Sequence, residues 1–427
     1  MKIKIAIIGS GPSAFYTAQY LLKEEGKYEI DIIEKLFSPF GLVRYGVSPD
    51  HQNTKNVIRV FNRTLNNENV EFFGDVEVNN SPSIDDLVNL YDATVVTTGM
   101  AIDKPINING TDKIGFYGAT EFVNWYNGHP EYENLNPDLN TDTAIIIGNG
   151  NVAIDCARLL VRTKKEMENS DITQYASKAL LNSPIRKVYI IGRRGPLDSK
   201  FTTVEIREMG ELLNCDSILS QGILKTIDSN LLNEKLPKQY KILTNFPEKK
   251  HKDSKKAKTV EFMFYSSPIE LLGDDKLRSV KFKNNLSKDN EIFTINTGLI
   301  ITAIGYLGDK IEGVKTDKSG MVIHNNNKIK DRLYTAGWVA RGPSGVIGTN
   351  KHDGANVAKQ IFNSIKSKKS PGRVGLKKLL NKINKRYISK KDWIRINEEE
   401  ISRGKDTLPR IKFTSNNEVY NFIDNHK

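Results

Sequence analysis

Two glycine-containing stretches constrain what this chain can fold into more than any other feature of its sequence. GSGPSA (residues 9–14) follows the apolar run 3–8, and GNGNVA (residues 148–153) follows the apolar run 143–147. Both fit the pattern GxGxxA between a strand-like run and a helical pattern. There the first glycine allows a tight turn, the second lets the backbone approach a pyrophosphate, and the third small residue lets helix and strand pack closely. The sequence therefore predicts two dinucleotide-binding βαβ units.

The residue that ends the second strand of each unit indicates which dinucleotide the unit binds. Glu34 follows the run 29–33, where a carboxylate can accept hydrogen bonds from a ribose diol and would repel a 2′-phosphate. The first unit therefore suits FAD or NAD. Arg193 and Arg194 follow the run 187–191, and paired guanidinium groups suit a 2′-phosphate, which favours NADP(H). The simplest reaction that joins the two sites is hydride transfer between a nicotinamide and a flavin.

Strand-like and helical patterns alternate along most of the chain, which is typical of α/β proteins with parallel sheets. The fold class is thus α/β with two Rossmann-like dinucleotide-binding domains. Further strands are expected at residues 93–99, 297–305 and 332–338, and a helix is expected to begin at Gly345. Polar or Ser/Pro/Gly/Lys-rich segments predict an insertion, a loop, and a linker before a helical C-terminal region, at residues 163–184, 228–258 and 367–375 respectively.

The 427-residue chain carries a formal net charge of +12, which fits nucleic acid, an anionic membrane or an acidic protein as a partner. Basic residues gather at 249–258 and 366–386, although a solvated lysine-rich surface explains either cluster as well. No run approaches the roughly 18 apolar residues of a membrane span. Cys156 and Cys215 form no CxxC, which argues against disulfide scaffolding and dithiol redox chemistry. No residue is assigned to a metal.

Longer segments resemble the adrenodoxin reductase type of ferredoxin–NADP⁺ reductase from end to end. The segments are GSGPSAFYTAQYLL (9–22), PFGLVRYGVSPDH (39–51), FVNWYNGHP (122–130), IGNGNVAIDCAR (147–158), IGRRGPLDSKFTTVEIREM (191–209), GWVARGPSGVIGTNKHDGA (337–355) and DWIRINEEEISRG (392–404). They are long and mutually ordered, so the resemblance is far more specific than either glycine loop. It implies a discontinuous FAD domain, residues 1–105 and 332–427, with an NADP domain, residues 106–331, inserted between its parts.

By position, the resemblance implies contacts to both cofactors. The FAD contacts, which include residues of the first loop and the glycine that ends the run 93–99, are Gly9, Gly11, Ser13, Ala14, Glu34, Leu42, Val78, Gly99, Trp338, Gly345, Val346 and Ile347. The NADP contacts are Asn149, Gly150, Asn151, Val152, Arg193, Arg194 and Glu205, and Gly345 is implied close to both cofactors. The amides of residues 345–347 would open a helix whose N-terminus favours negative charge on a reduced flavin.

Three candidate catalytic residues are implied near the reacting rings. His51 and Asp155 match family positions near the flavin and the nicotinamide, and we assign them positioning and proton management. A hydrogen-bonded His–Asp pair that only orders loops is the alternative. Glu205 is assigned to orienting the nicotinamide end. Hydride transfer itself needs no general base, because the nicotinamide and flavin N5 exchange hydride directly.

The leading hypothesis is an FAD-dependent ferredoxin–NADP⁺ reductase, in which NADPH delivers hydride to FAD and single electrons pass to a ferredoxin. A ferredoxin is a small acidic iron–sulfur protein, so the positive net charge of this chain would attract it. The alternatives are a flavin monooxygenase, a disulfide reductase, which the missing CxxC disfavours, and a sensor that binds both nucleotides without turnover. We expect a monomer with no nucleic-acid partner. Because the apolar run begins at Ile3, we expect the cytoplasm, or the mitochondrial matrix if a leader has been removed.

Overall fold

The chain divides into two compact units. The computed structural model describes residues 2–227, 236–249, 256–289, 291–405 and 407–426. Unit 1 consists of Met1–Ile102, Asn127–Glu133 and Tyr306–Lys427, and unit 2 of Asp103–Tyr126 and Asn134–Gly305. Two of the crossings coincide with β5 (Ile102–Asp103) and β15 (Tyr306–Leu307), which pair as a two-stranded sheet.

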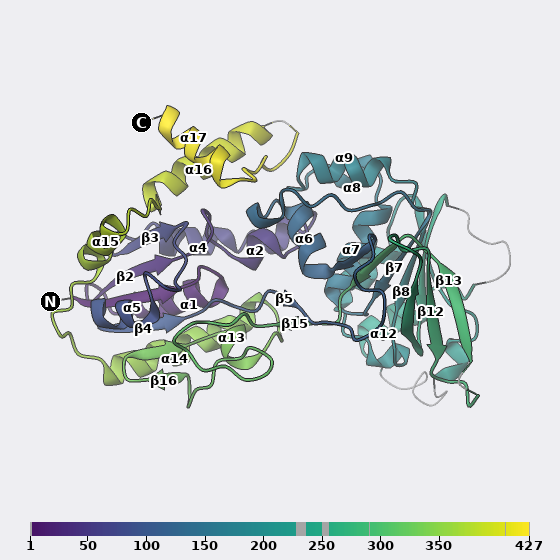
Figure 1. Ribbon diagram of the computed structural model, residues 1–427, viewed down its shortest axis with the longest axis horizontal. Coiled ribbons are helices and arrows are strands. Elements are labelled where there is room, and N and C mark those ends of the chain that lie inside the picture. The colour runs from purple at the N-terminus through teal and green to yellow at the C-terminus, as the bar shows by residue number, and fades with distance from the viewer. Residues whose placement is uncertain (1, 228–235, 250–255, 290, 406, 427) are drawn as a thin grey trace. The chain divides into compact units, whose positions relative to one another are not determined.

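Unit 1 is built on a seven-stranded sheet of order β16-β17-β4-β1-β2-β3-β18 (Figure 1). Its strands are β1 (Ile3–Ile8), β2 (Tyr28–Ile33), β3 (Val70–Gly74), β4 (Ala93–Val96), β16 (Lys328–Lys330), β17 (Leu333–Thr335) and β18 (Ile388–Ser389). The strands from β17 to β3 run parallel, and β16 and β18 add antiparallel edges. The carboxyl ends of β1, β2 and β4 therefore meet at one edge, where such sheets bind ligands.

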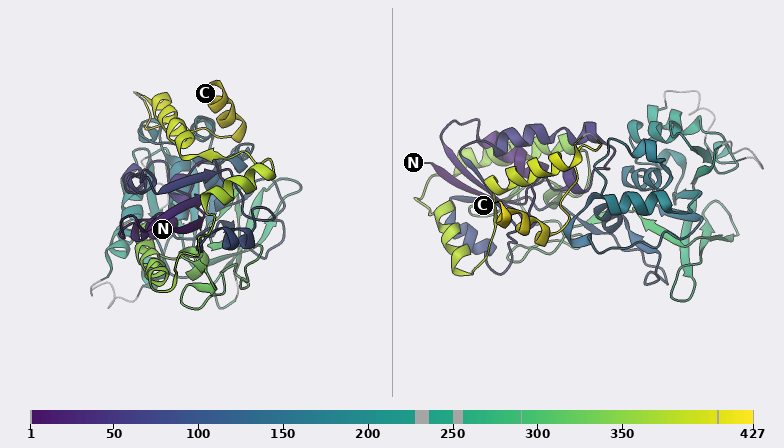
Figure 2. Two further views of the ribbon diagram at one scale, coloured as in Figure 1. Left: turned by 90° about the vertical axis from the view of Figure 1, so that its left-hand side faces the viewer. Right: turned by 90° about the horizontal axis from the view of Figure 1, so that it is seen from above.

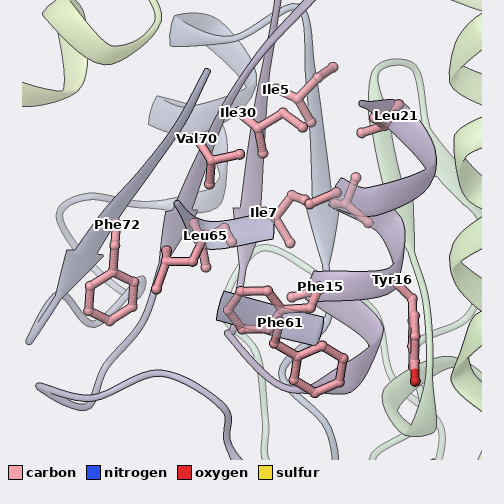
Figure 3. Close-up of a cluster of buried hydrophobic side chains, with 14 of the residues drawn as sticks. Ile5, Ile7, Phe15, Tyr16, Leu21, Ile30, Phe61, Leu65, Val70 and Phe72 are labelled. Carbon is pink, nitrogen blue, oxygen red and sulfur yellow. The ribbon is translucent and has the colours of Figure 1, made fainter. Parts of the chain in front are cut away.

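Side chains of β1 alternate between the two faces of this sheet, so helices cover both. Ile5 and Ile7 pack with Phe15 of α1 and Phe61 of α4 (Figure 3), whereas Ile8 belongs to a second cluster with α5 and α15. The helices are α1 (Pro12–Leu21), α2 (Leu42–Tyr45), α3 (Gln52–Lys55), α4 (Ile58–Leu65), α5 (Ile84–Leu90), η1 (Pro130–Tyr132), α13 (Trp338–Arg341), η4 (Ile347–Thr349), α14 (Asn350–Ser364), α15 (Arg373–Lys382), α16 (Lys390–Gly404) and α17 (Asn416–Asn425).

A buried ion pair attaches the C-terminal helices, yellow in Figures 1 and 2, to the rest of unit 1. Arg44 of α2 donates two hydrogen bonds, of 2.8 and 2.5 Å, to the carboxylate of Glu400 in α16. Both side chains are almost fully buried, and Arg410 adds a third donor at 3.1 Å. Burial alone would raise the pKa of Glu400, but the charges of Arg44 and Arg410 and the hydrogen bonds it accepts lower it below its ordinary value.

Unit 2 is built on a six-stranded parallel sheet of order β6-β14-β7-β8-β10-β9. Its strands are β6 (Phe116–Gly118), β7 (Thr143–Ile147), β8 (Lys187–Ile191), β9 (Cys215–Leu219), β10 (Lys258–Met263) and β14 (Leu299–Thr302). Its helices are α6 (Ala119–Asn127), which ends at the boundary, α7 (Asn151–Val161), α8 (Lys164–Met167), α9 (Gln174–Asn182), η2 (Pro196–Asp198), α10 (Thr203–Gly210), η3 (Leu224–Thr226) and α12 (Lys238–Thr244). The helix α7, which follows the second glycine loop, packs on β7 and β8.

A three-stranded antiparallel sheet packs on the parallel sheet of unit 2. It consists of β11 (Ser266–Leu272), β12 (Ser279–Asn284) and β13 (Ile292–Asn296). Val280 and Phe282 of β12 join Ile145, Ile147 and Ile191 of the parallel sheet in one apolar cluster. Among the described residues, no helix combines the length and the apolar character that a membrane span requires.

The predicted domain boundaries differ from the two units. Residues 306–331, assigned to the NADP domain from the sequence, pack with unit 1 because Ile311, Val314 and Val322 join its second apolar cluster. The segment 127–133 also belongs to unit 1. The chain therefore re-enters unit 1 directly after Gly305, the glycine that ends the run 297–305.

Several local predictions also need correction. No strand was predicted between residues 228 and 296, so the three-stranded sheet and β10 were missed. Part of the expected loop, residues 228–235 and 250–255, lies outside the described residues, and α12 occupies part of the remainder. The expected strand 332–338 is shorter, because Trp338 already begins α13. The helix expected from Gly345 begins with η4 and continues as α14.

Removing the charge of Glu400 should destabilise unit 1 strongly. In Glu400→Gln the buried Arg44 loses its counter-ion, which typically costs about 3–5 kcal/mol of unfolding free energy. Asp424→Asn is the matched control, because it breaks the exposed pair with Arg386, which is worth less than about 1 kcal/mol. Urea denaturation followed by circular dichroism measures both.

Because the pKa of Glu400 is lowered in the folded protein, the stabilisation that its carboxylate provides is lost as pH falls through the folded pKa. The unfolding free energies of wild type and Glu400→Gln should therefore converge in acid. Equal destabilisation by both variants would contradict the structural role of the pair.

Candidate dinucleotide-binding sites

The first glycine of each loop is pressed against a backbone carbonyl at the end of a neighbouring strand. Gly9 has φ +91°, and a Cβ there would lie 2.7 Å from the Thr97 oxygen, just after β4. Gly148 has φ +126°, and a Cβ there would lie 2.2 Å from the Ala303 oxygen, just after β14. Both the left-handed backbone and the lack of space require glycine at these two positions.

The second glycine of each loop faces open space. Apart from the glycine itself and its two chain neighbours, no heavy atom of the described residues lies within 4 Å of a Cβ placed on Gly11 or Gly150. Gly11 is the N-cap of α1 and Gly150 the N-cap of α7, and neither has a side chain to bond the first amides of its helix. Free amides and the positive end of the helix dipole favour a diphosphate in such a cradle. The residues present therefore fit a dinucleotide at each loop.

Glu34 lies beside the first loop, as the sequence predicts. Its carboxylate accepts hydrogen bonds from the amide of Ser10 at 2.9 Å, the hydroxyl of Ser10 at 2.6 Å and the amide of Leu36 at 3.1 Å. Burial raises the pKa of Glu34, and these hydrogen bonds only partly oppose that effect. An ionised carboxylate has about four acceptor positions, so it can still accept from a ribose hydroxyl.

The segment after β2 folds over the first loop. Phe40 donates its amide to the Ser10 oxygen at 3.0 Å, and a Cβ on Gly41 would lie 3.1 Å from the Cα of Gly11. This contact places Leu42, the half-buried first residue of α2, just after the segment that touches the loop.

The other predicted FAD residues of unit 1 fall into three places. Ser13 and Ala14 are buried in α1, Gly99 follows β4 and Val78 follows β3. Ser13 donates its hydroxyl to Asn350 at 2.8 Å and so joins α1 to α14.

Trp338, Gly345, Val346 and Ile347 lie in or near the exposed segment before α14. The indole of Trp338 donates to the Ser344 oxygen at 3.1 Å, and its ring stacks on Tyr306. Gly345 and Val346 are exposed, and Ile347 begins η4.

Arg193 and Arg194 occupy the corresponding place in unit 2, directly after β8 and one glycine. Both side chains are exposed, in contrast to the buried Glu34. Arg194 lies 3.2 Å from Asp198, and both groups of that pair are about half exposed. An exposed pair of this kind contributes little free energy, so it can exchange for a phosphate at low cost.

The segment after the arginine pair folds back on the second loop. Lys200 donates its amide to the Asn149 oxygen at 3.0 Å, and Thr202 donates its amide to the side chain of Asn151 at 2.8 Å. Val152 follows in the first turn of α7 and is half-buried. The predicted NADP residues thus lie in unit 2, and the predicted FAD residues lie in unit 1.

The candidate catalytic residues are divided between the units. His51 lies in unit 1 at the N-cap of α3. Asp155 and Glu205 lie in unit 2, on α7 and in the first turn of α10, where the Thr202 hydroxyl donates to the Glu205 carboxylate.

Arg158 was not predicted as a site residue from the sequence. It is fully buried, donates to Asp155 at 2.7 Å and lies 3.3 Å from Glu208 of α10. It thus fixes the Asp155 carboxylate and joins α7 to α10. The available signal was the spacing of an acidic and a basic residue three positions apart on one helix.

The basic cluster at 249–258 is partly used for internal contacts. Lys256 and Lys258 donate to the backbone oxygens of Leu212 and Leu160, and burial lowers the pKa of Lys258. Lys249 lies 3.4 Å from the buried Glu261. The other lysines of the cluster, Lys250, Lys252 and Lys255, lie outside the described residues.

The two glycine loops at the carboxyl ends of two parallel sheets define a protein with two Rossmann-like dinucleotide-binding units. No protein-family model matches the chain. The chain is 36% identical to the mitochondrial NADPH:adrenodoxin oxidoreductase of Salvelinus fontinalis, over 94% of this chain and 87% of that relative. It is 35% identical to the NADPH-ferredoxin reductase FprA of Mycobacterium tuberculosis, over 84% of each chain. The solved structure of that FprA in complex with NADPH matches with a TM-score of 0.91 at 32% identity, over 99% of both chains.

The chain therefore belongs to the family of NADPH:adrenodoxin oxidoreductases and NADPH-ferredoxin reductases. The family predicted from the sequence and the α/β fold class are confirmed. Its relatives include proteins named as mitochondrial and a bacterial one.

Alanine in place of the first or the second glycine of the second loop should have two different effects, one on stability and one on nucleotide binding. Gly148→Ala should lower the unfolding temperature, because its Cβ collides with the Ala303 oxygen. Gly150→Ala should leave the unfolding temperature unchanged and weaken NADP⁺ binding about tenfold or more, because its Cβ enters the space for the pyrophosphate. Differential scanning fluorimetry and calorimetric titration measure the two effects. The account of the loop fails if Gly150→Ala binds NADP⁺ as wild type does.

Proposed function

We propose that the chain is an FAD-dependent NADPH–ferredoxin reductase. The observation that carries this proposal is the difference between two otherwise similar loops. The first has the buried acceptor Glu34 beside it, and the second has the exposed donors Arg193 and Arg194. The first loop suits FAD as a resident cofactor, and the second suits NADPH as a substrate that exchanges.

The residues of unit 1 hold FAD and those of unit 2 hold NADPH, so unit 1 is the FAD domain and unit 2 the NADP domain. The bound flavin supplies the ability to accept a hydride and to release electrons one at a time. The amides of the first turn of α1, from Ser13 onward because Pro12 has no N–H, would bind its diphosphate, and Glu34 would accept a hydrogen bond from its ribose.

In unit 2 the chain's own residues bind and orient the nucleotide. The amides of the α7 N-terminus bind the diphosphate, and the arginine pair binds the 2′-phosphate. Asp155, fixed by Arg158, and Glu205 orient the nicotinamide end. His51 of unit 1 positions groups and manages protons near the flavin.

The electron acceptor is a small acidic iron–sulfur protein of the ferredoxin type. The family to which the chain belongs and its net charge of +12 both support such a partner. A monomer, a cytoplasmic location and the absence of a nucleic-acid partner remain predictions. Gel filtration tests the oligomeric state, and cell fractionation tests the location.

Anaerobic reduction tests this function. NADPH should bleach the flavin absorbance of the protein, and an added oxidised ferredoxin should restore it as the ferredoxin becomes reduced. Failure of NADPH to bleach the flavin would sink the reductase proposal and favour a sensor. Consumption of oxygen in step with NADPH, in air and without ferredoxin, would favour a monooxygenase.

The arginine pair can be tested separately. In the double variant Arg193→Ala/Arg194→Ala, the preference for NADPH over NADH in kcat/KM should fall by roughly two orders of magnitude, because a charge-assisted hydrogen bond contributes about 1.5–3 kcal/mol. Lys283→Ala, a cation on β12 of the same unit, is the control and should keep the preference. An unchanged ratio in the double variant would contradict the assignment of the 2′-phosphate site.

A further inference from the structure

The three-stranded sheet holds the backbone of the arginine pair from outside. Asn285, the residue after β12, donates its side-chain amide to the carbonyl oxygen of Arg193 at 2.7 Å and to the hydroxyl of Ser267 at 2.9 Å. Tyr265, the residue before β11, donates its backbone amide to the carbonyl oxygen of Arg194 at 3.1 Å. Each carbonyl of the pair therefore accepts a hydrogen bond from the antiparallel sheet.

The two donors are tied to each other and to the residues on either side of the pair. Asn285 donates its backbone amide to the Tyr265 oxygen at 2.7 Å, and Ser266 donates its amide to the Gly192 oxygen at 3.1 Å. On the other side, a Cβ on Gly195 would lie 2.3 Å from the Tyr265 hydroxyl oxygen. Residues 192–195 are thus fixed along their whole length.

Fixing this backbone matters because both arginine side chains are exposed and long. A free arginine loses considerable rotamer entropy when it binds a phosphate, and every uncertainty in the position of its Cα adds to that loss. Two guanidinium groups bind one phosphate well only if their backbones start from a defined geometry. In this structure the antiparallel sheet supplies that geometry.

We propose that Asn285 and Tyr265 are positioning residues that set the preference of unit 2 for a 2′-phosphorylated adenosine. They act through the backbone of Arg193 and Arg194, and they need not touch the nucleotide. The inference rests on the proposed function, in which the arginine pair binds the 2′-phosphate. It gives the three-stranded sheet a role in cofactor choice besides its role in the core.

Affinities for 2′,5′-ADP and 5′-AMP, measured by calorimetric titration on the FAD-containing protein, test the proposal. These ligands share adenosine and one phosphate and differ in the 2′-phosphate alone. Asn285→Ala should weaken 2′,5′-ADP binding about fivefold and leave 5′-AMP binding nearly unchanged, since one hydrogen bond contributes about 1 kcal/mol. Asn285→Asp should weaken it more, because a carboxylate would face the Arg193 oxygen and repel the phosphate.

Asn284→Ala is the matched control. The side chain of the neighbouring Asn284 donates to Glu291 at 3.0 Å and accepts from the amide of Leu286 at 3.0 Å. Its loss therefore disturbs the same hairpin and leaves the hydrogen bonds of Asn285 and Tyr265 to the arginine pair in place. This control should keep both affinities. Gly195→Ala is a second variant: its Cβ would collide with the hydroxyl end of the Tyr265 ring, so the ring or the backbone at residue 195 must shift, and it should show a smaller loss of the same selective kind as Asn285→Ala.

The outcomes separate the inference from the function on which it rests. If wild type binds 2′,5′-ADP and 5′-AMP equally, the 2′-phosphate site is wrong and the inference falls with it. If wild type discriminates but Asn285→Ala and Gly195→Ala discriminate equally well, only the inference is overturned. Equal weakening of both ligands in these variants would also overturn it, because that result indicates a general structural defect.

Discussion

In both units the glycine loop touches the end of a neighbouring strand so closely that no side chain fits between them. The contacts of Gly9 with the Thr97 oxygen and of Gly148 with the Ala303 oxygen fix each loop at the carboxyl edge of its parallel sheet. From that fixed point the chain turns into α1, whose first amide donor is that of Ser13 because Pro12 has no N–H, or into α7, and neither N-cap glycine has a side chain that bonds these amides. The position of every other group in the two sites is set relative to these amides, so the remaining chemistry depends on this contact.

On this shared scaffold the two units differ in charge and exposure. Glu34 is buried, and its carboxylate accepts three hydrogen bonds. Arg193 and Arg194 are exposed, and their backbone accepts hydrogen bonds from residues next to the antiparallel sheet. A buried acceptor suits a nucleotide that stays with the protein. Exposed, pre-oriented donors suit a nucleotide that arrives, reacts and leaves, because binding then needs little rearrangement of the protein. The proposed reductase uses one site of each kind.

Local sequence patterns predicted the parts of the fold that local physics decides. The glycine loops, the strands that precede them, Glu34 and the arginine pair each have a local signature, within about 30 residues in the first unit and about 50 in the second. The link between Arg44 and Glu400 spans 356 positions and leaves no local signal. The strands SVKFKN and IFTIN are short and lie near a long polar segment, so their alternation was not recognised. For the same reason the support of the arginine pair by Asn285 became visible only in three dimensions.

The central claim is that the two loops bind two different nucleotides, each selected by the residue at the end of its second strand. A crystal structure of the protein with FAD and NADP⁺ bound tests this claim most directly. The account predicts that the 2′-phosphate lies within hydrogen-bonding distance of the guanidinium groups of Arg193 and Arg194, and that the adenosine ribose of FAD lies at the Glu34 carboxylate. A 2′-phosphate bound away from the arginine pair, or the NADP⁺ ribose at Glu34, would contradict it.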